Sequence, residues 1–126
     1  MSVLQQEEKE ILLEHIIEGI KEKRGKDILS IDLRKLDNSI CRYFVICHGD
    51  SNTQVNAIAN WIEHTIEEKL NEKVWHKEGF ENATWILLDY VDIIVHVFQK
   101  ESRDFYNLEG LWADGYLSKF ENEYFN

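Results

Sequence analysis

Two long segments of the chain carry apolar residues at a helical period. In residues 3–24 the apolar stripe consists of Leu12, Leu13, Ile16, Ile17 and Ile20, between Glu and Lys residues. Gly25 follows where a C-terminal cap belongs. The second stripe comes after Gly49 and consists of Val55, Ile58, Ala59, Ile62, Ile66 and Leu70. Both patterns predict amphipathic helices that pack one face on a core.

The residues before the second stripe indicate where its helix begins. Ser51 and Gln54 have the spacing of a capping box. In that motif the Ser51 hydroxyl accepts a hydrogen bond from the third helical N–H, and the Gln54 side chain reaches back to the backbone N–H of Ser51. We therefore predict Ser51 as the N-cap.

Short apolar runs predict the strands. Residues 27–33 and 43–47 have the composition of two strands, with a polar loop over 34–40 between them, and 74–77 is a weaker candidate. Residues 84–89 and 92–98 are both rich in β-forming side chains, and only Tyr90-Val91 separates them. That separation predicts a β-hairpin.

The hairpin turn carries an unfavourable residue. A two-residue turn requires positive φ, which the β-branched side chain of Val91 disfavours. The turn is therefore either strained or longer than two residues, and a longer turn would shift the register of the strands.

A two-residue turn places Trp85 opposite His96 and Asp89 opposite Asp92, and opposed residues share a sheet face. One face then carries Ile86, Leu88, Ile93, Val95 and Val97, and we expect it to lie under helices. The other carries Trp85, Leu87, Asp89, Asp92, Ile94, His96 and Phe98. An aromatic anchor with aliphatic flanks and a polar rim is typical of a protein interface. The alternative is that another segment, such as the C-terminal tail, covers this face.

The end of the chain gives a weaker signal. A last helix is expected from Ser102, with Phe105, Leu108, Leu111 and Trp112 pointing inward, whereas residues 116–126 cannot be assigned. The chain contains no proline, and we find no repeat or linker in it. We therefore predict one domain over residues 1–126, of the α/β class, with a mixed sheet of about five strands flanked by helices.

Charge narrows the class of partner. The net charge is −10, and the acidic residues are spread over the 126-residue chain without any Lys/Arg cluster. A surface of this sign is repelled by phosphate, so direct nucleic-acid binding is not expected and basic proteins are the favoured partners. The chain shows neither an apolar run that could span a membrane nor a signal peptide, so we expect a cytoplasmic protein.

The residues with catalytic potential have simpler explanations. Gly49-Asp50-Ser51 is similar to a nucleophile elbow, but Thr53 stands where that motif requires glycine. Asp89 and Asp92 could hold a divalent ion for nucleotidyl transfer, although no lysine or phosphate cradle accompanies them. Cys41 and Cys47 would lie roughly 20 Å apart on one strand, too far for a disulfide. No catalytic residue, metal or cofactor is predicted.

Three segments together resemble a known family. The first contains Tyr43-Phe44-Val45-Ile46, Gly49, Ser51 and Gln54-Val55. The second contains Glu78-Gly79 and the run from Trp85 to Phe98. The third contains Arg103, Phe105-Tyr106, Leu108-Glu109 and Leu111-Trp112. In this order, over about residues 27–114, they resemble the ribosomal silencing factors, also called the Iojap family.

The resemblance implies a nucleotidyltransferase-like shape without catalysis, and a translation repressor instead of an enzyme. It implies binding to ribosomal protein L-fourteen on the large ribosomal subunit, steric obstruction of the small subunit, and self-association as a homodimer off the ribosome. It also assigns Trp85, Asp89, Asp92 and His96 to the shared surface. Two rival functions are a dimeric adaptor for another basic protein and a metal-dependent nucleotidyltransferase-like enzyme.

The chain departs from the family pattern at four positions. Many members carry Asp where Arg42 stands and Gly where Val91 stands. The other two departures are His48 and Thr53, where members have a hydroxyl residue and a basic residue. These differences concern local contacts and the hairpin turn.

Overall fold

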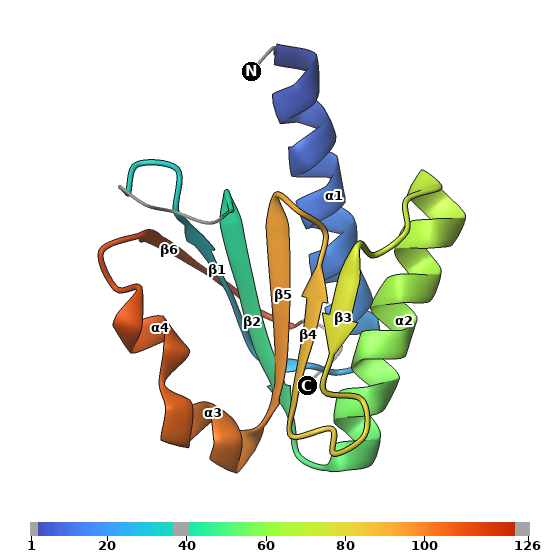
Figure 1. Cartoon of the computed structure of the whole chain (residues 1–126), viewed down its shortest axis with the longest axis vertical. Helices are drawn as coiled ribbons and strands as arrows, with labels where there is room; N and C mark the ends of the chain where they lie inside the picture. The colour runs from blue at the N-terminus through green and yellow to red at the C-terminus, as the bar shows by residue number, and fades with distance from the viewer. Residues whose placement is uncertain (1–2, 37–40, 123–126) are drawn as a thin grey trace.

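A six-stranded mixed sheet forms the centre of the computed structural model, which describes residues 3–36 and 41–122 (Figure 1). The strand order is β3-β4-β5-β2-β1-β6. β2 and β5 pair in parallel, and the other neighbours pair antiparallel. The strands are β1 (Lys26–Asp32), β2 (Tyr43–Gly49), β3 (His76–Glu78), β4 (Trp85–Asp89), β5 (Ile93–Gln99) and β6 (Tyr116–Phe120). The α/β class with a mixed sheet is confirmed, with six strands instead of about five.

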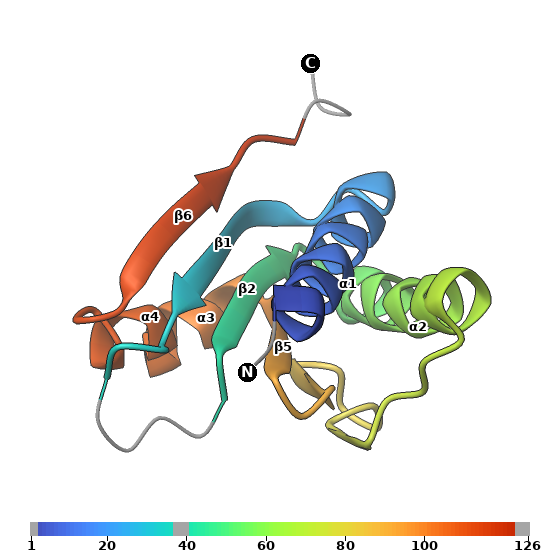
Figure 2. The same ribbon diagram turned by 90° about the horizontal axis from the view of Figure 1, so that it is seen from above.

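Two long helices cover one face of the sheet, as Figure 2 shows. They are α1 (Val3–Glu22) and α2 (Asn52–Leu70), and they pack on each other and on the sheet. Their apolar stripes and the strand residues beneath them form the larger core cluster, in which most side chains are less than 2% exposed. None of the described helices is long and apolar enough to cross a membrane.

Two short helices lie on the opposite side, which we call the second face (Figure 2). They are α3 (Lys100–Tyr106) and α4 (Leu108–Leu111). A smaller buried cluster lies there, made of Leu29, Ile31, Leu33, Phe44, Ile46, Ile94, Phe98 and Leu108. Because α3 and α4 have only seven and four residues, they are too short to cover this face as α1 and α2 cover the other.

Both predicted helix ends are close to the observed ones, with different local contacts. Ser51 is the N-cap of α2, and its Oγ accepts from the backbone N–H of Gln54 at 3.1 Å. The Gln54 Oε1 accepts from the N–H of Asp50 instead of Ser51, at 2.8 Å. After α1 the left-handed residue is Arg24 (φ 61°), while Gly25 allows close packing because a Cβ there would collide with Ile20.

The register predicted for the hairpin was wrong by two residues. Trp85 pairs with Phe98 and Leu87 with His96, because the two turn residues are Val91 and Asp92 instead of Tyr90 and Val91. Side chains alternate between faces with period two, so a shift of two residues leaves the side chains within the two strands on their predicted faces. Asp92 is the exception, because it now lies in the turn and its carboxylate pairs with Lys9 of α1, on the opposite face. Val91 adopts φ 75°, so of the two alternatives for this turn, strained or longer than two residues, the structure shows the strained one.

The C-terminal segment differs most from the prediction. Asn107 has φ 47° and divides the expected helix into α3 and α4. Leu108 points inward as predicted, but Phe105 and Leu111 are among the most exposed apolar residues. Residues 116–120, left unassigned, form β6 on the outer edge of β1, and 123–126 lie outside the described residues.

We predict that Ser51→Ala lowers the free energy of unfolding by about 1 kcal/mol, because the first turn of α2 loses the acceptor for the Gln54 N–H. Urea denaturation followed by circular dichroism measures the change. Thr53→Ala, an exposed residue two positions further along, serves as the control and should be close to neutral. An equal loss in both variants would contradict the capping role.

Candidate functional site

Six of the seven residues predicted for an interface come together on the second face, over β4 and β5. The seventh, Asp92, lies in the turn, and its carboxylate contacts Lys9 of α1, a helix on the opposite face. Trp85, Leu87, Asp89 and Asp92 are partly exposed. Ile94, His96 and Phe98 belong to the same face but are buried within the chain. The predicted site thus has an accessible part on β4 and a buried part on β5 that supports it.

Trp85 links the two parts. Its indole Nε1–H donates to His96 Nδ1 at 3.1 Å, and its ring lies 4.8 Å from that of Phe98. Phe44 packs edge-on against His96 at 4.8 Å between ring centroids. The orientation of Trp85 is therefore fixed by one hydrogen bond and by contacts with neighbouring rings, so this aromatic side chain is already ordered before any partner arrives.

His96 is held neutral by its surroundings. It is 4% exposed, and burial lowers the pKa of its imidazole from 6.5 to about 4. Because Nδ1 accepts from Trp85, the ring proton of the neutral form belongs to Nε2. Nε2 is buried and has no hydrogen-bond partner among the described residues. A charged His96 would thus disrupt both the Trp85 contact and the apolar cluster.

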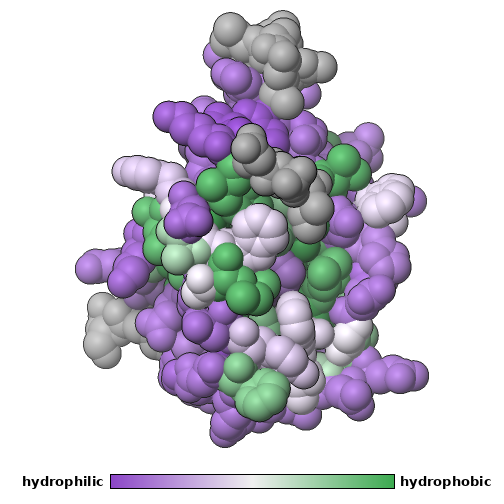
Figure 3. Space-filling model, turned by 60° about the vertical axis from the view of Figure 1, so that its left-hand side comes forward, coloured by the Kyte–Doolittle hydropathy of each residue, from purple (hydrophilic) through white to green (hydrophobic). Residues whose placement is uncertain are grey.

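Sequence reasoning missed the outer part of this surface. Tyr106 of α3 lies 4.9 Å from Trp85, and Phe105 lies 5.0 Å from Tyr106, between ring centroids. Phe98, Trp85, Tyr106 and Phe105 thus form a row of rings, which we call the aromatic row, from the buried core to the 81% exposed Phe105. Figure 3 shows apolar side chains gathered across the middle of this face, with hydrophilic ones around them. The adjacent aromatic residues Phe105 and Tyr106 are the sequence feature that could have indicated this outer part of the surface.

A hollow of about 270 Å³ lies beside Trp85 and Leu87, and Glu78 and Gly79 form its other wall. Gly79 has φ 93°, and a Cβ there would collide with the carbonyl oxygen of Trp85. The Glu78-Gly79 motif is therefore explained by the close approach of two backbones at the edge of the surface.

The two aspartates of the turn make separate contacts. Asp89 Oδ1 accepts from the backbone N–H of Val91 at 2.7 Å, and Asp92 Oδ2 lies 2.9 Å from Lys9 Nζ of α1. Among the described residues, no group of three or more His, Cys, Asp or Glu side chains could hold a metal ion. Asp89 thus orders the turn and gives this end of the surface its negative charge, whereas the charge of Asp92 is paired with Lys9.

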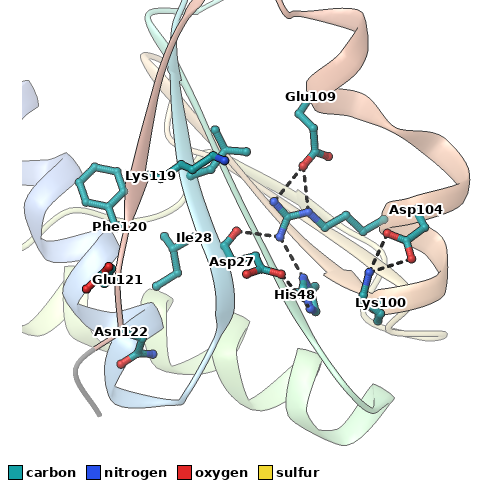
Figure 4. A pocket seen from close by; sticks show the side chains of 12 residues that line it. Asp27, Ile28, His48, Lys100, Asp104, Glu109, Lys119, Phe120, Glu121 and Asn122 are labelled. Carbon is teal, nitrogen blue, oxygen red and sulfur yellow. Dashed lines mark hydrogen bonds and ion pairs between the residues drawn. The ribbon is translucent and has the colours of Figure 1, made fainter. Parts of the chain in front are cut away.

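Arg103 fixes the short helices to the sheet (Figure 4). Its Nη1 donates to the carbonyl oxygen of Asp27 at 2.8 Å and lies 2.9 Å from His48 Nδ1. Its Nε and Nη2 donate to Glu109 Oε2 at 3.1 and 2.9 Å. Arg103 is 6% exposed, so these contacts join α3, α4, β1 and β2 in a buried network. Burial and the nearby guanidinium both lower the pKa of His48.

A pocket of about 710 Å³ lies next to this network, between the start of α3 and β6 (Figure 4). Lys100, Arg103 and Lys119 contribute positive charge to its wall. Its acidic lining residues are Asp27, Asp104, Glu109 and Glu121. Arg103 and Lys100 are paired with Glu109 and Asp104, respectively, so the wall favours no ion of either sign.

Comparison with known proteins gives consistent matches. The model of the family described as "Ribosomal silencing factor during starvation" matches residues 5–124. The ribosomal silencing factor of Bacillus subtilis is 43% identical over 100 residues, which cover 79% of this chain and 83% of the relative. That of Halalkalibacterium halodurans is 37% identical, covering 82% and 86%. A solved structure from Chromobacterium violaceum superposes with a TM-score of 0.77 at 33% identity, covering 90% and 88%.

The neutral state of His96 predicts a pH-dependent stability. The folded chain holds the pKa of His96 at about 4, whereas the unfolded chain restores the ordinary value of about 6.5. Between these values the unfolded state binds more protons. The free energy of unfolding should therefore be fully retained above pH 6.5 and should fall as the pH is lowered toward 4.

Urea denaturation at pH 7.5, 6.0 and 5.0 measures this dependence. His96→Gln is the matched variant, because its side chain still offers an acceptor to Trp85 but does not titrate in this range. Its stability should fall less steeply than that of the wild type. Identical slopes for the two proteins would show that His96 is not the group responsible.

Proposed function

Because this chain belongs to the RsfS family of ribosomal silencing factors, we propose that it represses translation by binding the large ribosomal subunit through ribosomal protein L-fourteen. The bound chain would then block joining of the small subunit sterically. In this mechanism the chain occupies a surface of the large subunit that the small subunit must contact. No covalent bond has to be made or broken, so we propose a regulator instead of an enzyme.

The aromatic row is the observation that carries this proposal. Trp85 is pre-oriented by its hydrogen bond to His96, and Tyr106 and Phe105 continue the apolar surface outward. Aromatic residues with few rotatable bonds are frequent binding hot spots because little side-chain entropy is lost when they are ordered. We propose Trp85 and Leu87 as the central contacts, with Phe105 and Tyr106 beside them.

The buried members of the predicted site have a supporting role in this proposal. Ile94 and Phe98 form the apolar floor beneath the surface, and His96 orients Trp85. Asp89 provides the polar rim at the turn end of β4, and Asp92 borders it in the turn, where Lys9 of α1 offsets its charge. A partner would thus meet an apolar centre with negative charge at one side.

The charge of the chain supports the choice of partner. Ribosomal proteins lie against RNA phosphates, which favours basic surfaces on them. The net charge of −10 opposes direct contact with RNA and favours association with such a basic protein. A protein contact on the large subunit is therefore more consistent with this surface than an RNA contact.

We predict that Trp85→Glu weakens binding to purified large subunits by more than about 2 kcal/mol, or roughly 30-fold, because a charge replaces the apolar centre. Co-sedimentation at fixed ionic strength measures the affinity. Trp85 also packs in the chain, so Phe105→Ser is the second variant. Phe105 is almost fully exposed, and its replacement should weaken binding without loss of stability.

Tyr116→Ser is the matched control, because Tyr116 is an equally exposed aromatic residue on β6, at the opposite edge of the sheet from β3 and β4. It should bind as the wild type does. Wild-type affinity in folded Trp85→Glu and Phe105→Ser variants would contradict the proposed surface, and absence of wild-type binding would contradict the function itself.

A further inference from the structure

Among the seven residues of α3, all of which the structure describes, Arg103 alone is buried, although it carries a charge. The aromatic residues of this helix face solvent instead, with Phe105 81% and Tyr106 50% exposed. A helix that buries no apolar side chain gains little from the hydrophobic effect. The position of α3 on the sheet therefore depends on the polar contacts of Arg103 more than on packing.

The sheet side of this contact is an irregular stretch of β1. The pairing of β1 with β2 shifts register between Lys26 and Leu29, and Asp27 adopts φ 47°. Such an irregularity turns backbone groups away from the ladder, so their hydrogen bonds must be made elsewhere. Arg103 Nη1 donates to the carbonyl oxygens of Asp27 at 2.8 Å and of Lys26 at 3.4 Å. His48 of β2 adds an acceptor at 2.9 Å, so this part of the sheet is suited to receive a guanidinium.

The other side of the guanidinium faces α4 (Figure 4). Its Nε and Nη2 both donate to Glu109 Oε2, at 3.1 and 2.9 Å. A guanidinium can contact the sheet and α4 together because its five N–H groups point outward in one plane. A lysine ammonium would keep the charge, but its single nitrogen cannot reach β1 and Glu109 at once. Arg103 therefore holds α3 between the sheet and α4.

The segment that Arg103 holds carries the outer part of the aromatic row. Phe105 and Tyr106 lie two and three positions after Arg103 in the same short helix. The start of this helix is fixed separately, because the N–H of Gln99 donates to the carbonyl oxygen of Thr84 at 2.8 Å. The helix ends after Tyr106, so a change at Arg103 would displace the end at which both rings lie.

We propose that Arg103 is a positioning residue for partner binding: it determines where Phe105 and Tyr106 lie beside Trp85. This inference rests on the proposed function, because the partner is the same basic protein of the large subunit. The 6% exposure of Arg103 supports an indirect role, since a buried guanidinium cannot itself meet a partner. The buried arginine thus determines the shape of a surface to which it does not belong.

Arg103→Lys tests this role, because it keeps the charge and removes the planar set of donors. The variant should bind purified large subunits about tenfold more weakly in co-sedimentation, at a temperature at which it is fully folded. Lys100→Arg is the matched control, because it preserves the charge of an exposed residue on the same helix, and it should bind as the wild type does. A merely structural role would lower the melting temperature of Arg103→Lys and leave the affinity of the folded protein unchanged.

Two further readouts distinguish positioning from stability. The Tyr106 ring lies 4.9 Å from that of Trp85, so displacement of α3 should shift the indole N–H signal of Trp85 in a nitrogen–proton NMR spectrum. The signal of Trp61, on α2, should not move. In a variant that lacks both outer rings, Phe105→Ser/Tyr106→Ser, Arg103→Lys should lower the affinity less than about threefold, because residues that act through one another are not additive.

Glu109→Ala is the second variant and decides the question if Arg103→Lys does not fold. It removes the acceptor of two of the five hydrogen bonds of Arg103. Binding should weaken about threefold relative to Glu101→Ala, which removes the same charge from an exposed position on α3.

Three results would overturn the inference. If the wild-type chain does not sediment with large subunits, the proposed function fails and this inference fails with it. If the wild type binds and folded Arg103→Lys and Glu109→Ala bind equally well, Arg103 has a structural role alone, while the proposed function stands. If Arg103→Lys weakens binding equally with and without the two outer rings, Arg103 acts by a route other than the aromatic row.

Discussion

The central parallel pair, β2 and β5, determines how the rest of the molecule must be built. Both strands have apolar residues on both sides, so each face of the sheet needs a cover. The long helices α1 and α2 supply one cover. The second face has only α3 and α4, and Arg103 fixes them by five hydrogen bonds to main-chain and side-chain groups. This short cover leaves Trp85 and Leu87 of β4 partly exposed, and it places Tyr106 beside Trp85.

The sequence predicted which sheet face the side chains of β4 and β5 occupy, but it did not predict which residues of the two strands pair. Which face a side chain occupies depends only on the period of two along a strand, so the assignment for Trp85 and Phe98 was confirmed despite the shifted register. The register depends on which two residues form the turn, and that is set by the burial of Tyr90 and Ile93. The local pattern also failed for Phe105, because the break at Asn107 ends α3, and Phe105 therefore does not share a helix face with the buried Leu108. The pairing of β6 with β1 joins distant segments and leaves no local signal.

Family membership and surface geometry support the proposed function in different ways. Membership in the RsfS family concerns the whole chain, since the family model matches residues 5–124. The geometry identifies which accessible side chains could act: the outer members of the aromatic row, which Trp85 joins to the core. The family resemblance alone assigned both Trp85 and His96 to the shared surface, without distinguishing their roles. The structure separates them, because one is partly exposed and the other is buried beneath it.

In the proposed mechanism, the bound chain prevents the two ribosomal subunits from joining. Light scattering during rapid mixing of purified small and large subunits tests it most directly, with the large subunits preincubated with increasing amounts of the chain. The amplitude of the association signal should fall with the fraction of large subunits occupied. An undiminished amplitude at saturating occupancy would contradict it, because a chain that binds without obstructing the small subunit cannot silence the ribosome by this mechanism.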